Sequence, residues 1–295
     1  MNNEQIAIGV DIGGTNIRAG AVTSGGNLIG EPFSIPTGAN DPRELILKRI
    51  IRSISSVIEF NRLQKADICG IGLGVTGPLD VKNGKILQCL NLPTMDFFPL
   101  REVIGNEFGL PVTMNNDANA MVLGETCYGA GKGSDNVLGI TLGTGLGCAI
   151  ILNRKIVMGA TETAGEIWIS PFRNGNIEDV VSGRGISMMY EKLCGEKLTA
   201  REIAARALSG ETQAKAVWRE FGEAVAYAIS WSVNLIDPEV VIIGGSIANS
   251  LELFYHSMNE FLRKNICPVP ARELRIAKAQ LGDNAGLIGA AALVY

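Results

Sequence analysis

A carboxylate stands beside two adjacent glycines near the start of the chain. Two apolar runs, residues 6–10 and 17–22, flank a turn that contains Asp11, Gly13, Gly14, Thr15 and Asn16. Glycine lets the backbone approach phosphate oxygens, the hydroxyl and amide can donate hydrogen bonds, and Asp11 can hold Mg²⁺ through water. The turn therefore predicts a site for phosphate and magnesium, with a plain β-turn as the alternative.

A second glycine-rich turn has a similar sequence. It contains Gly143, Thr144 and Gly145, and the segment that begins at Leu138 repeats the pattern of the segment that begins at Ile8. Each copy reads as strand, turn and strand, which predicts two α/β domains built on one plan and facing each other across a cleft that holds phosphates. Chance similarity of two glycine turns is the alternative.

A third turn, Gly244 and Gly245, follows the apolar run at residues 240–243. Such a turn at the carboxyl end of a strand lets a flat ligand lie against the backbone. The chain lacks GxxxxGK[ST], and the glycine spacing of these turns is not GxGxxG, so the turns match neither the P-loop nor the dinucleotide-binding fingerprint.

Asp117 is the candidate general base. It follows a predicted strand at residues 111–114 and precedes a helix expected to open at Ala120. Phosphoryl transfer needs a carboxylate within hydrogen-bond reach of the attacking hydroxyl. A helix-capping role is the alternative, and one residue can serve both purposes.

Two further carboxylates, Glu166 and Glu178, lie among glycines and apolar residues. Carboxylates can accept hydrogen bonds from a ligand rich in hydroxyl groups. Ordinary exposed loop residues are the alternative interpretation of both.

The composition narrows the class of protein. There are 26 Lys and Arg against 30 Asp and Glu, which argues against nucleic acid as a partner. The polar start of the chain lacks a secretory pattern, and no apolar run is long enough to span a membrane, so a cytoplasmic protein is expected. The six scattered cysteines and the single histidine, His256, form no familiar zinc pattern.

Taken together, these motifs resemble the ROK family (repressor, open reading frame, kinase) of bacterial glucokinase-like sugar kinases. The resemblance covers essentially the whole chain. It rests on the three glycine turns, on Asn116-Asp117-Ala118, on Ala164-Gly165-Glu166, and on the segments Gly77-Pro78, Asn91-Leu92-Pro93 and Glu178 ahead of Ser182-Gly183-Arg184-Gly185.

The resemblance implies an α/β protein of two ribonuclease H-like (actin-like ATPase) domains. We expect a smaller N-terminal domain at residues 1–119, with a C-terminal helix at about residues 284–295 packing back on it, and a larger domain at residues 120–283. The family also implies Mg·ATP and a sugar as substrates, transfer to the 6-hydroxyl of a hexose, and a homodimer.

The resemblance assigns roles to individual residues. Asp117 falls at the catalytic aspartate, and the first two glycine turns fall at the ATP phosphates. Gly244 and Gly245 fall near the adenosine. The expected sugar-binding residues are Gly77, Asn91, Asn116, Glu166 and Glu178.

The chain departs from the family pattern at Ile169, where family members carry a zinc-binding histidine that also touches the sugar. No cysteine lies between Cys148 and Cys194, so residues 171–177 read as a shortened loop, and no structural zinc is expected. Glucose is the default substrate, and β-glucosides, allose, mannose, fructose and N-acetylmannosamine remain open. A sugar-sensing regulator of the same family is the alternative from another class.

Overall fold

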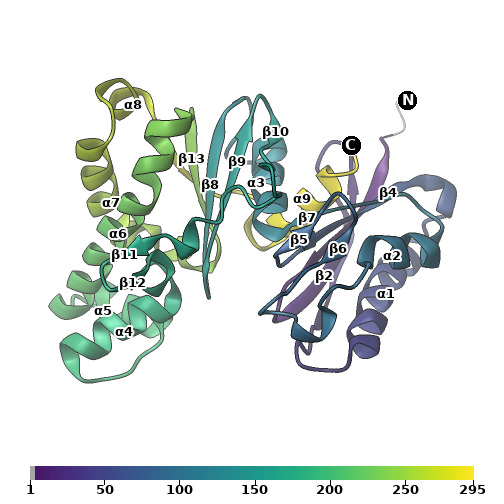
Figure 1. Ribbon diagram of the computed structural model, residues 1–295, viewed down its shortest axis with the longest axis horizontal. Helices are drawn as coiled ribbons and strands as arrows, with labels where there is room; N and C mark the ends of the chain where they lie inside the picture. Colours follow the sequence, from purple (N-terminus) through teal and green to yellow (C-terminus); the bar gives the residue numbers. More distant parts are fainter. Residues whose placement is uncertain (1–3) are drawn as a thin grey trace. The chain divides into compact units, whose positions relative to one another are not determined.

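The computed structural model describes residues 4–295; residues 1–3, within the polar start of the chain, lie outside the described part. The chain divides into two compact units (Figure 1). The first comprises residues 4–133, Lys155–Ala164 and Gln280–Tyr295, and the second comprises Ser134–Arg154 and Gly165–Ala279. No helix in residues 4–295 is long and apolar enough to cross a membrane.

The first unit is built on a five-stranded sheet with the order β3-β2-β1-β4-β7. Its strands are β1 (Ile6–Ile12), β2 (Asn16–Thr23), β3 (Leu28–Pro36), β4 (Ile68–Val75) and β7 (Val112–Asn116). β1 and β2 form an antiparallel hairpin, whereas β1, β4 and β7 run parallel. Parallel strands end at the same edge of a sheet, which is where ligands bind in such folds.

Helices cover this sheet on both faces (Figure 1). α1 (Arg43–Phe60) buries an isoleucine stripe, Ile46, Ile50 and Ile54, against the strands. α9 (Ala285–Ala292) packs on β1 and β4 from the other side and also contacts α3 (Asp117–Tyr128). The α9 backbone lies so close to β1 and β4 that a side chain at Gly9 or Gly72 would overlap it.

The remaining elements of the first unit are short. They are η1 (Lys65–Asp67), β5 (Leu79–Asp80), β6 (Lys85–Ile86), η2 (Pro93–Met95), α2 (Leu100–Phe108), β10 (Lys155–Ile156) and η6 (Gly282–Asn284). The boundary expected at residue 119 falls inside α3, and the first unit continues to Gly133 because α3 packs along α9. Residues 155–164 and 280–283, expected in the larger domain, also belong to the first unit.

In the second unit, four strands lie side by side in the order β9-β8-β13-β14. They are β8 (Val137–Leu142), β9 (Leu146–Leu152), β13 (Val240–Gly244) and β14 (Arg275–Lys278). β8 and β9 form an antiparallel hairpin, and β13 runs parallel to both β8 and β14. This is the plan of the first unit, so the predicted repeat and the α/β fold class are confirmed.

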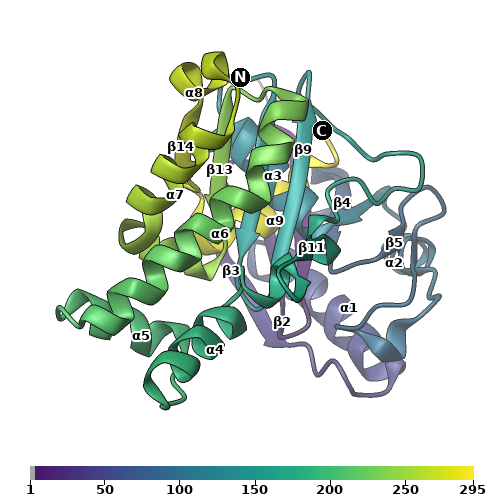
Figure 2. The same ribbon diagram turned by 60° about the vertical axis from the view of Figure 1, so that its left-hand side comes forward.

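α6 (Thr212–Ile236) is the long helix of the second unit and runs beside α7 (Leu251–Asn265) (Figure 2). Trp218 and Phe221 of α6 pack against Phe254 of α7, with ring centroids 5.8 and 5.1 Å apart, respectively. The other elements are η3 (Ile167–Ile169), β11 (Pro171–Phe172), β12 (Gly175–Asn176), η4 (Ile177–Asp179), α4 (Gly183–Cys194), α5 (Ala200–Leu208), η5 (Ser246–Ser250) and α8 (Pro268–Glu273).

Candidate functional site

Several of the predicted residues gather at the carboxyl edge of the first sheet. Ile12, Val75 and Asn116 are in register across β1, β4 and β7, so the chain leaves all three strands at one edge. Asp11 lies just before this edge and Asp117 just after it. The sheet therefore holds two carboxylates near each other.

The first glycine turn is closed by its own backbone. The Gly13 N–H donates to the Asn16 carbonyl at 3.1 Å, and the Thr37 hydroxyl donates to the Gly13 carbonyl at 2.7 Å. Gly14 lies against Asn91, because a β-carbon at Gly14 would stand 3.2 Å from the Asn91 carbonyl oxygen. The turn and the loop that carries Asn91 are therefore in contact.

The predicted sugar-binding residues of this unit lie close to the same turn. The Asn91 amide donates to the Thr76 hydroxyl at 3.1 Å, and the Thr76 N–H donates to the Ile12 carbonyl at 3.0 Å. A β-carbon at Gly77 would stand 3.1 Å from the Asn116 side-chain nitrogen. Hydrogen bonds and van der Waals contacts thus connect these amides to the first turn.

Asp117 is the first residue of α3, three residues before the helix start expected from the sequence. The capping residue is Asn116, whose Oδ1 accepts the N–H groups of Ala118 and Asn119 at 2.9 and 3.4 Å. The Asp117 Oδ1 also accepts the Ala118 N–H at 2.8 Å. The cap position therefore belongs to Asn116, and the second Asp117 oxygen does not take part in that contact.

The Asp11 carboxyl has an unusual environment. Burial, and then the nearby Asp117 carboxylate, raise the pKa of Asp11 from 3.8 to about 7, while Arg18, its cross-strand partner, acts in the opposite direction. The Arg18 guanidinium donates to the Asn284 Oδ1 at 2.8 Å and to the Asp283 carbonyl. Arg18 thereby ties β2 to the segment that leads into α9.

Glycine at the second residue of α9 leaves room for the Asp11 carboxylate. A β-carbon at Gly286 would stand 2.6 Å from Oδ2 of Asp11 and 2.8 Å from its Cγ. The Asp11 carboxylate is therefore in direct contact with the first turn of α9. The sequence shows a helix of small residues here, but it does not show which carboxylate that helix touches.

In the second unit, the turn between β8 and β9 is also closed by a hydrogen bond within its own backbone. The Gly143 N–H donates to the Gly145 carbonyl at 3.0 Å, and the Gly143 carbonyl accepts the Gly183 N–H at 2.8 Å. Gly244 pairs with Thr141 at the end of β8, and Gly245 follows with a φ of 82°. The second and third glycine turns therefore lie at neighbouring strand ends.

Glu178 lies on the second turn. Its Oε2 accepts the Leu146 N–H at 2.8 Å, and Gly145 is so close to this oxygen that no side chain would fit there. The Trp168 indole N–H donates to Glu166. Burial raises the pKa of the nearby Cys148 thiol to about 12, and the Glu166 charge acts in the same direction. Both carboxylates are thus held by neighbours within the second unit.

The shortened loop is a small hairpin, β11 and β12. Ile169, just before it, has 57% of its surface exposed and supplies no polar group. In residues 4–295, no three His, Cys, Asp or Glu side chains are grouped as metal ligands. A cavity of about 720 Å³ lies beside the hairpin and is also lined by α4 and α6; it contains none of the predicted site residues.

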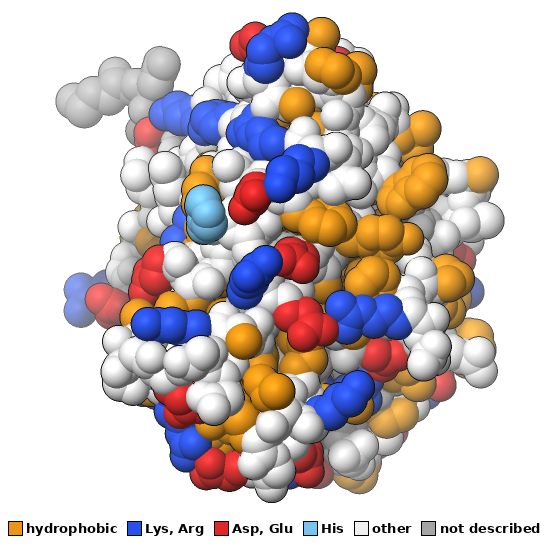
Figure 3. All heavy atoms as spheres, turned by 90° about the vertical axis from the view of Figure 1, so that its left-hand side faces the viewer, with side chains coloured by type: hydrophobic (Ala, Val, Ile, Leu, Met, Phe, Trp, Pro, Cys, Tyr) orange, Lys and Arg blue, Asp and Glu red, His pale blue; other side chains and the backbone are white. Residues whose placement is uncertain are grey.

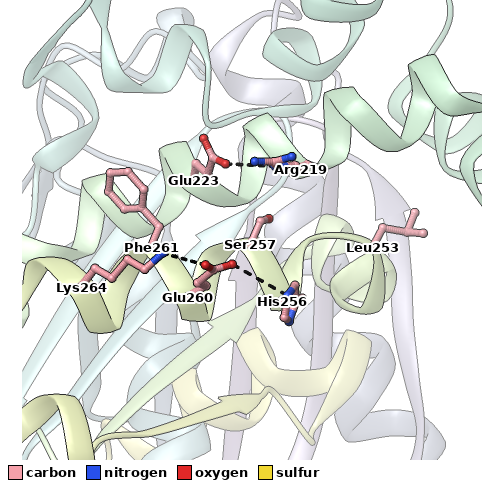
Figure 4. Close-up of a pocket in the computed structure, with 8 residues that line it drawn as sticks. All are labelled: Arg219, Glu223, Leu253, His256, Ser257, Glu260, Phe261 and Lys264. Atoms are coloured by element: carbon pink, nitrogen blue, oxygen red, sulfur yellow. Dashed lines mark hydrogen bonds and ion pairs between the residues drawn. The ribbon is translucent and has the colours of Figure 1, made fainter.

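A hollow of about 450 Å³ lies between α6 and α7 (Figure 4). Its charged groups are paired with neighbours one turn away, Arg219 with Glu223, and both Lys264 and His256 with Glu260. On the face seen in Figure 3, acidic and basic side chains are interspersed around His256. This hollow is a solvated surface feature and contains none of the predicted site residues.

Comparison with known proteins identifies the family. The model of the ROK family matches residues 7–295. The chain belongs to the ROK family. A glucokinase from Halalkalibacterium halodurans is 31% identical, with 97% of this chain and 94% of that protein aligned. An N-acetyl-D-glucosamine kinase from Vibrio cholerae is 30% identical, over 97% of this chain and 98% of that protein.

A solved structure shows the same fold. It is a ROK family glucokinase from Streptomyces griseus in complex with glucose and AMPPNP, 29% identical, with a TM-score of 0.83 and 98% of each chain covered. The predicted family and the predicted actin-like fold are therefore confirmed for this ROK chain.

The predicted site residues are divided between the two units. The first unit carries the catalytic candidate, the first turn and the residues Gly77, Asn91 and Asn116; the second carries the other two turns, Glu166 and Glu178. Sequence reasoning missed Arg18 and Gly286, because their contacts join residues far apart in the chain. It also missed Trp168 as the donor to Glu166, although the two residues are only two positions apart in the sequence, which makes such a contact possible.

Proposed function

We propose that this ROK chain is a cytoplasmic sugar kinase that transfers the γ-phosphoryl group of ATP to the 6-hydroxyl of a hexose, with Asp117 as general base. The observation that carries the proposal is the pair of carboxylates at one sheet edge, Asp11 near the end of the strand that leads into the first glycine turn and Asp117 at a helix start. The kinase class is supported by relatives named glucokinase and N-acetyl-D-glucosamine kinase.

Asp117 accepts the proton of the sugar hydroxyl as its oxygen attacks the phosphorus and the bond to ADP breaks. General-base help of this kind contributes about 10² to 10⁴ in rate. Asn116 supports the role by capping the first turn of α3, the turn on which Asp117 lies.

The glycine turns bind the nucleotide. In this proposal Gly13, Gly14, Thr15 and Asn16, together with Gly143, Thr144 and Gly145, contact the phosphates, and Gly244 and Gly245 lie against the adenosine. Glycine-rich turns with inward N–H groups suit phosphate oxygens.

Asp11 suits a magnesium ion held through water. Mg²⁺ takes one or two carboxylates, keeps several waters and shares the substrate phosphates, so it needs no cage of three protein ligands. When bound, it neutralises charge on the phosphates. Burial, and then repulsion from Asp117, raise the pKa of Asp11, and a bound cation would offset that repulsion.

Amide and carboxylate side chains suit the hydroxyl groups of a sugar. We assign this role to Gly77, Asn91 and Asn116, and to Glu166 and Glu178. Carboxylates held by N–H donors, as Glu178 is by Leu146, keep a second oxygen for a ligand.

Glucose is the first candidate substrate. Ile169 replaces a polar side chain with an apolar one at a position that the family uses for the sugar, and this favours tolerance of an altered substituent, such as a β-glucoside or an N-acetylated hexosamine. Mannose, allose and fructose are the other acceptors to be compared.

The test is ADP release from Mg·ATP with a panel of these sugars, and phosphorus NMR of the product. We expect sugar-dependent release, the highest kcat/KM for glucose, and phosphate on the 6-hydroxyl. Ile169→His should narrow the preference among glucose, glucosides and N-acetylated sugars. Absence of turnover with every sugar, together with sugar binding in calorimetry, would instead favour the non-catalytic regulator.

A further inference from the structure

Two arginines of the first unit lie between the first glycine turn and the loop that carries Asn91. We call residues 87–98, which lie between β6 and α2, the Asn91 loop. Arg43 and Arg49 belong to the first two turns of α1, the helix that follows β3 in the chain (Figure 1). Neither arginine is part of a glycine turn or of a sugar-binding motif.

Arg49 holds the segment that lies against the glycine turn. The buried Thr37 donates its hydroxyl to the Gly13 carbonyl at 2.7 Å and its N–H to the Thr15 carbonyl at 2.9 Å. The Arg49 guanidinium donates to the Thr37 carbonyl at 2.7 Å and pairs with the Asp41 carboxylate at 2.6 Å. One side chain therefore fixes both ends of this segment.

Arg43 holds the Asn91 loop. Its Nε donates to the Thr94 carbonyl at 2.9 Å, and its Nη2 donates to the Asp96 carbonyl at 3.1 Å. The Asp96 carboxylate in turn accepts the N–H of Cys89, two residues before Asn91, at 2.9 Å. Because the guanidinium is planar and rigid, it can fix two carbonyls at once, which the single ammonium of lysine does less well.

A third contact joins the loop directly to the segment beside the glycine turn. The Thr94 hydroxyl donates to the Asp41 carbonyl at 2.8 Å. The loop is also anchored in the core of the unit by Leu92 and Met95, which are fully buried. The unit can therefore keep its fold when one of the polar contacts is lost, while the loop becomes free to shift.

We propose that Arg43 and Arg49 are positioning residues that hold the Asn91 loop in place relative to the first glycine turn. The inference rests on the proposed function, in which Asn91 binds a sugar hydroxyl and the turn binds the ATP phosphates. The two arginines then keep the acceptor contact and the phosphate contact of the first unit in register. A misplacement of about 1 Å is enough to lower the rate on the order of 10²-fold.

The kinetic test compares Arg43→Met, Arg49→Met and the double variant, with the sugar that has the highest kcat/KM. Arg43→Met should raise the KM for the sugar by about 10-fold and leave the KM for Mg·ATP nearly unchanged, because its hydrogen bonds go to the loop. Arg49→Met should raise both KM values, because Thr37 also holds the turn. In the double variant the two effects on the sugar KM should be less than multiplicative, since both act through one loop.

Two further variants serve as controls. Arg43→Lys should recover part of the lost affinity for sugar, because it keeps the charge and one donor near the loop. Arg52→Met, at an exposed residue of the same helix, should change neither KM. Circular dichroism and thermal unfolding check that all variants are folded.

Hydrogen exchange measured by mass spectrometry tests the inference without turnover. Peptides from the Asn91 loop should exchange at least about 5-fold faster in Arg43→Met than in the wild type, and Arg52→Met should match the wild type. Unchanged exchange of this loop in Arg43→Met would overturn the proposal, and so would fully multiplicative effects of the two arginine variants on the sugar KM. A wild type that turns over no sugar would refute the proposed function, and the exchange of the loop would then decide the inference alone.

Discussion

Gly286→Ala tests whether α9 positions the Asp11 carboxylate. The added β-carbon would stand 2.6 Å from the Asp11 Oδ2, whereas ordinary contacts begin at 3.4 Å, so the carboxylate or the helix must move by about 0.8 Å. A misplacement of about 1 Å costs on the order of 10² in rate when it affects the reacting groups. We therefore expect kcat/KM for Mg·ATP to fall by about 10- to 100-fold.

The fold should survive this substitution. Overpacking costs about 1–3 kcal/mol, and replacing a helical glycine by alanine returns about 0.5–1 kcal/mol. The net loss of stability is then at most about 2.5 kcal/mol, and steady-state kinetics over a range of magnesium concentrations can be measured on folded protein.

The matched control is Gly105→Ala in α2. There the added β-carbon would meet only Leu110 and Val112, both at 3.7 Å, so neither kinetics nor fold should suffer. Wild-type kinetics for Gly286→Ala, at unchanged magnesium dependence, would refute the view that the contact between Asp11 and Gly286 positions the carboxylate.

Three further predictions concern single carboxylates. The pKa of Asp11 is raised from 3.8 to about 7, so the folded chain loses stability as pH rises through that window. In metal-free calorimetry, Asp11→Asn should therefore stabilise the chain by an amount that grows from none near pH 4 to about 4 kcal/mol above pH 7. A gain in stability that does not depend on pH would contradict this prediction. Glu125 is fully buried and accepts the N–H groups of Ala130 and Leu281 at 2.8 and 2.7 Å, so Glu125→Ala should cost about 2–4 kcal/mol in urea unfolding and Glu125→Gln less. Glu178→Gln should raise the KM for the sugar by about 10- to 100-fold and the KM for Mg·ATP by less. Glu220→Gln, at an exposed ion pair, is the control and should change neither KM. Equal effects of the two variants on the KM for the sugar would count against a contact between Glu178 and the sugar.

The strands that form the site could be predicted closely from the sequence. β4 spans Ile68–Val75, the run predicted from its apolar residues, and β1 and β13 extend only slightly beyond their predicted bounds. Continuous β-branched runs bounded by glycine turns indicate buried strands because few other structures can bury every side chain.

For other elements, the amino-acid composition does not indicate the structure that forms or where it begins. β3 (Leu28–Pro36) contains a glycine and two prolines, which are typical of loops, and it forms because it pairs with β2 as an edge strand. α3 begins earlier than predicted because the Asn116 side chain, rather than an apolar residue, determines where the helix starts.

The contacts that hold the site residues in place could not be predicted, because they join parts of the chain that lie far apart in the sequence. Arg18 reaches Asn284, and Gly286 touches Asp11, across more than 260 residues. The pKa of Asp11 is raised by burial and then by the Asp117 carboxylate, which lies more than 100 residues away in the chain. Motif spacing identifies the residue types at a site but not the neighbours that tune them.

The central claim is that Asp117 accepts the proton of a sugar hydroxyl. The direct test is ADP release by the wild type and by Asp117→Asn at saturating Mg·ATP, with and without sugar, with nucleotide binding measured on the same samples. We predict that the variant folds, binds nucleotide with little change and loses sugar-dependent turnover by at least about 10²-fold. Undiminished sugar-dependent turnover in Asp117→Asn, or ADP release by the wild type that does not depend on sugar, would contradict the account.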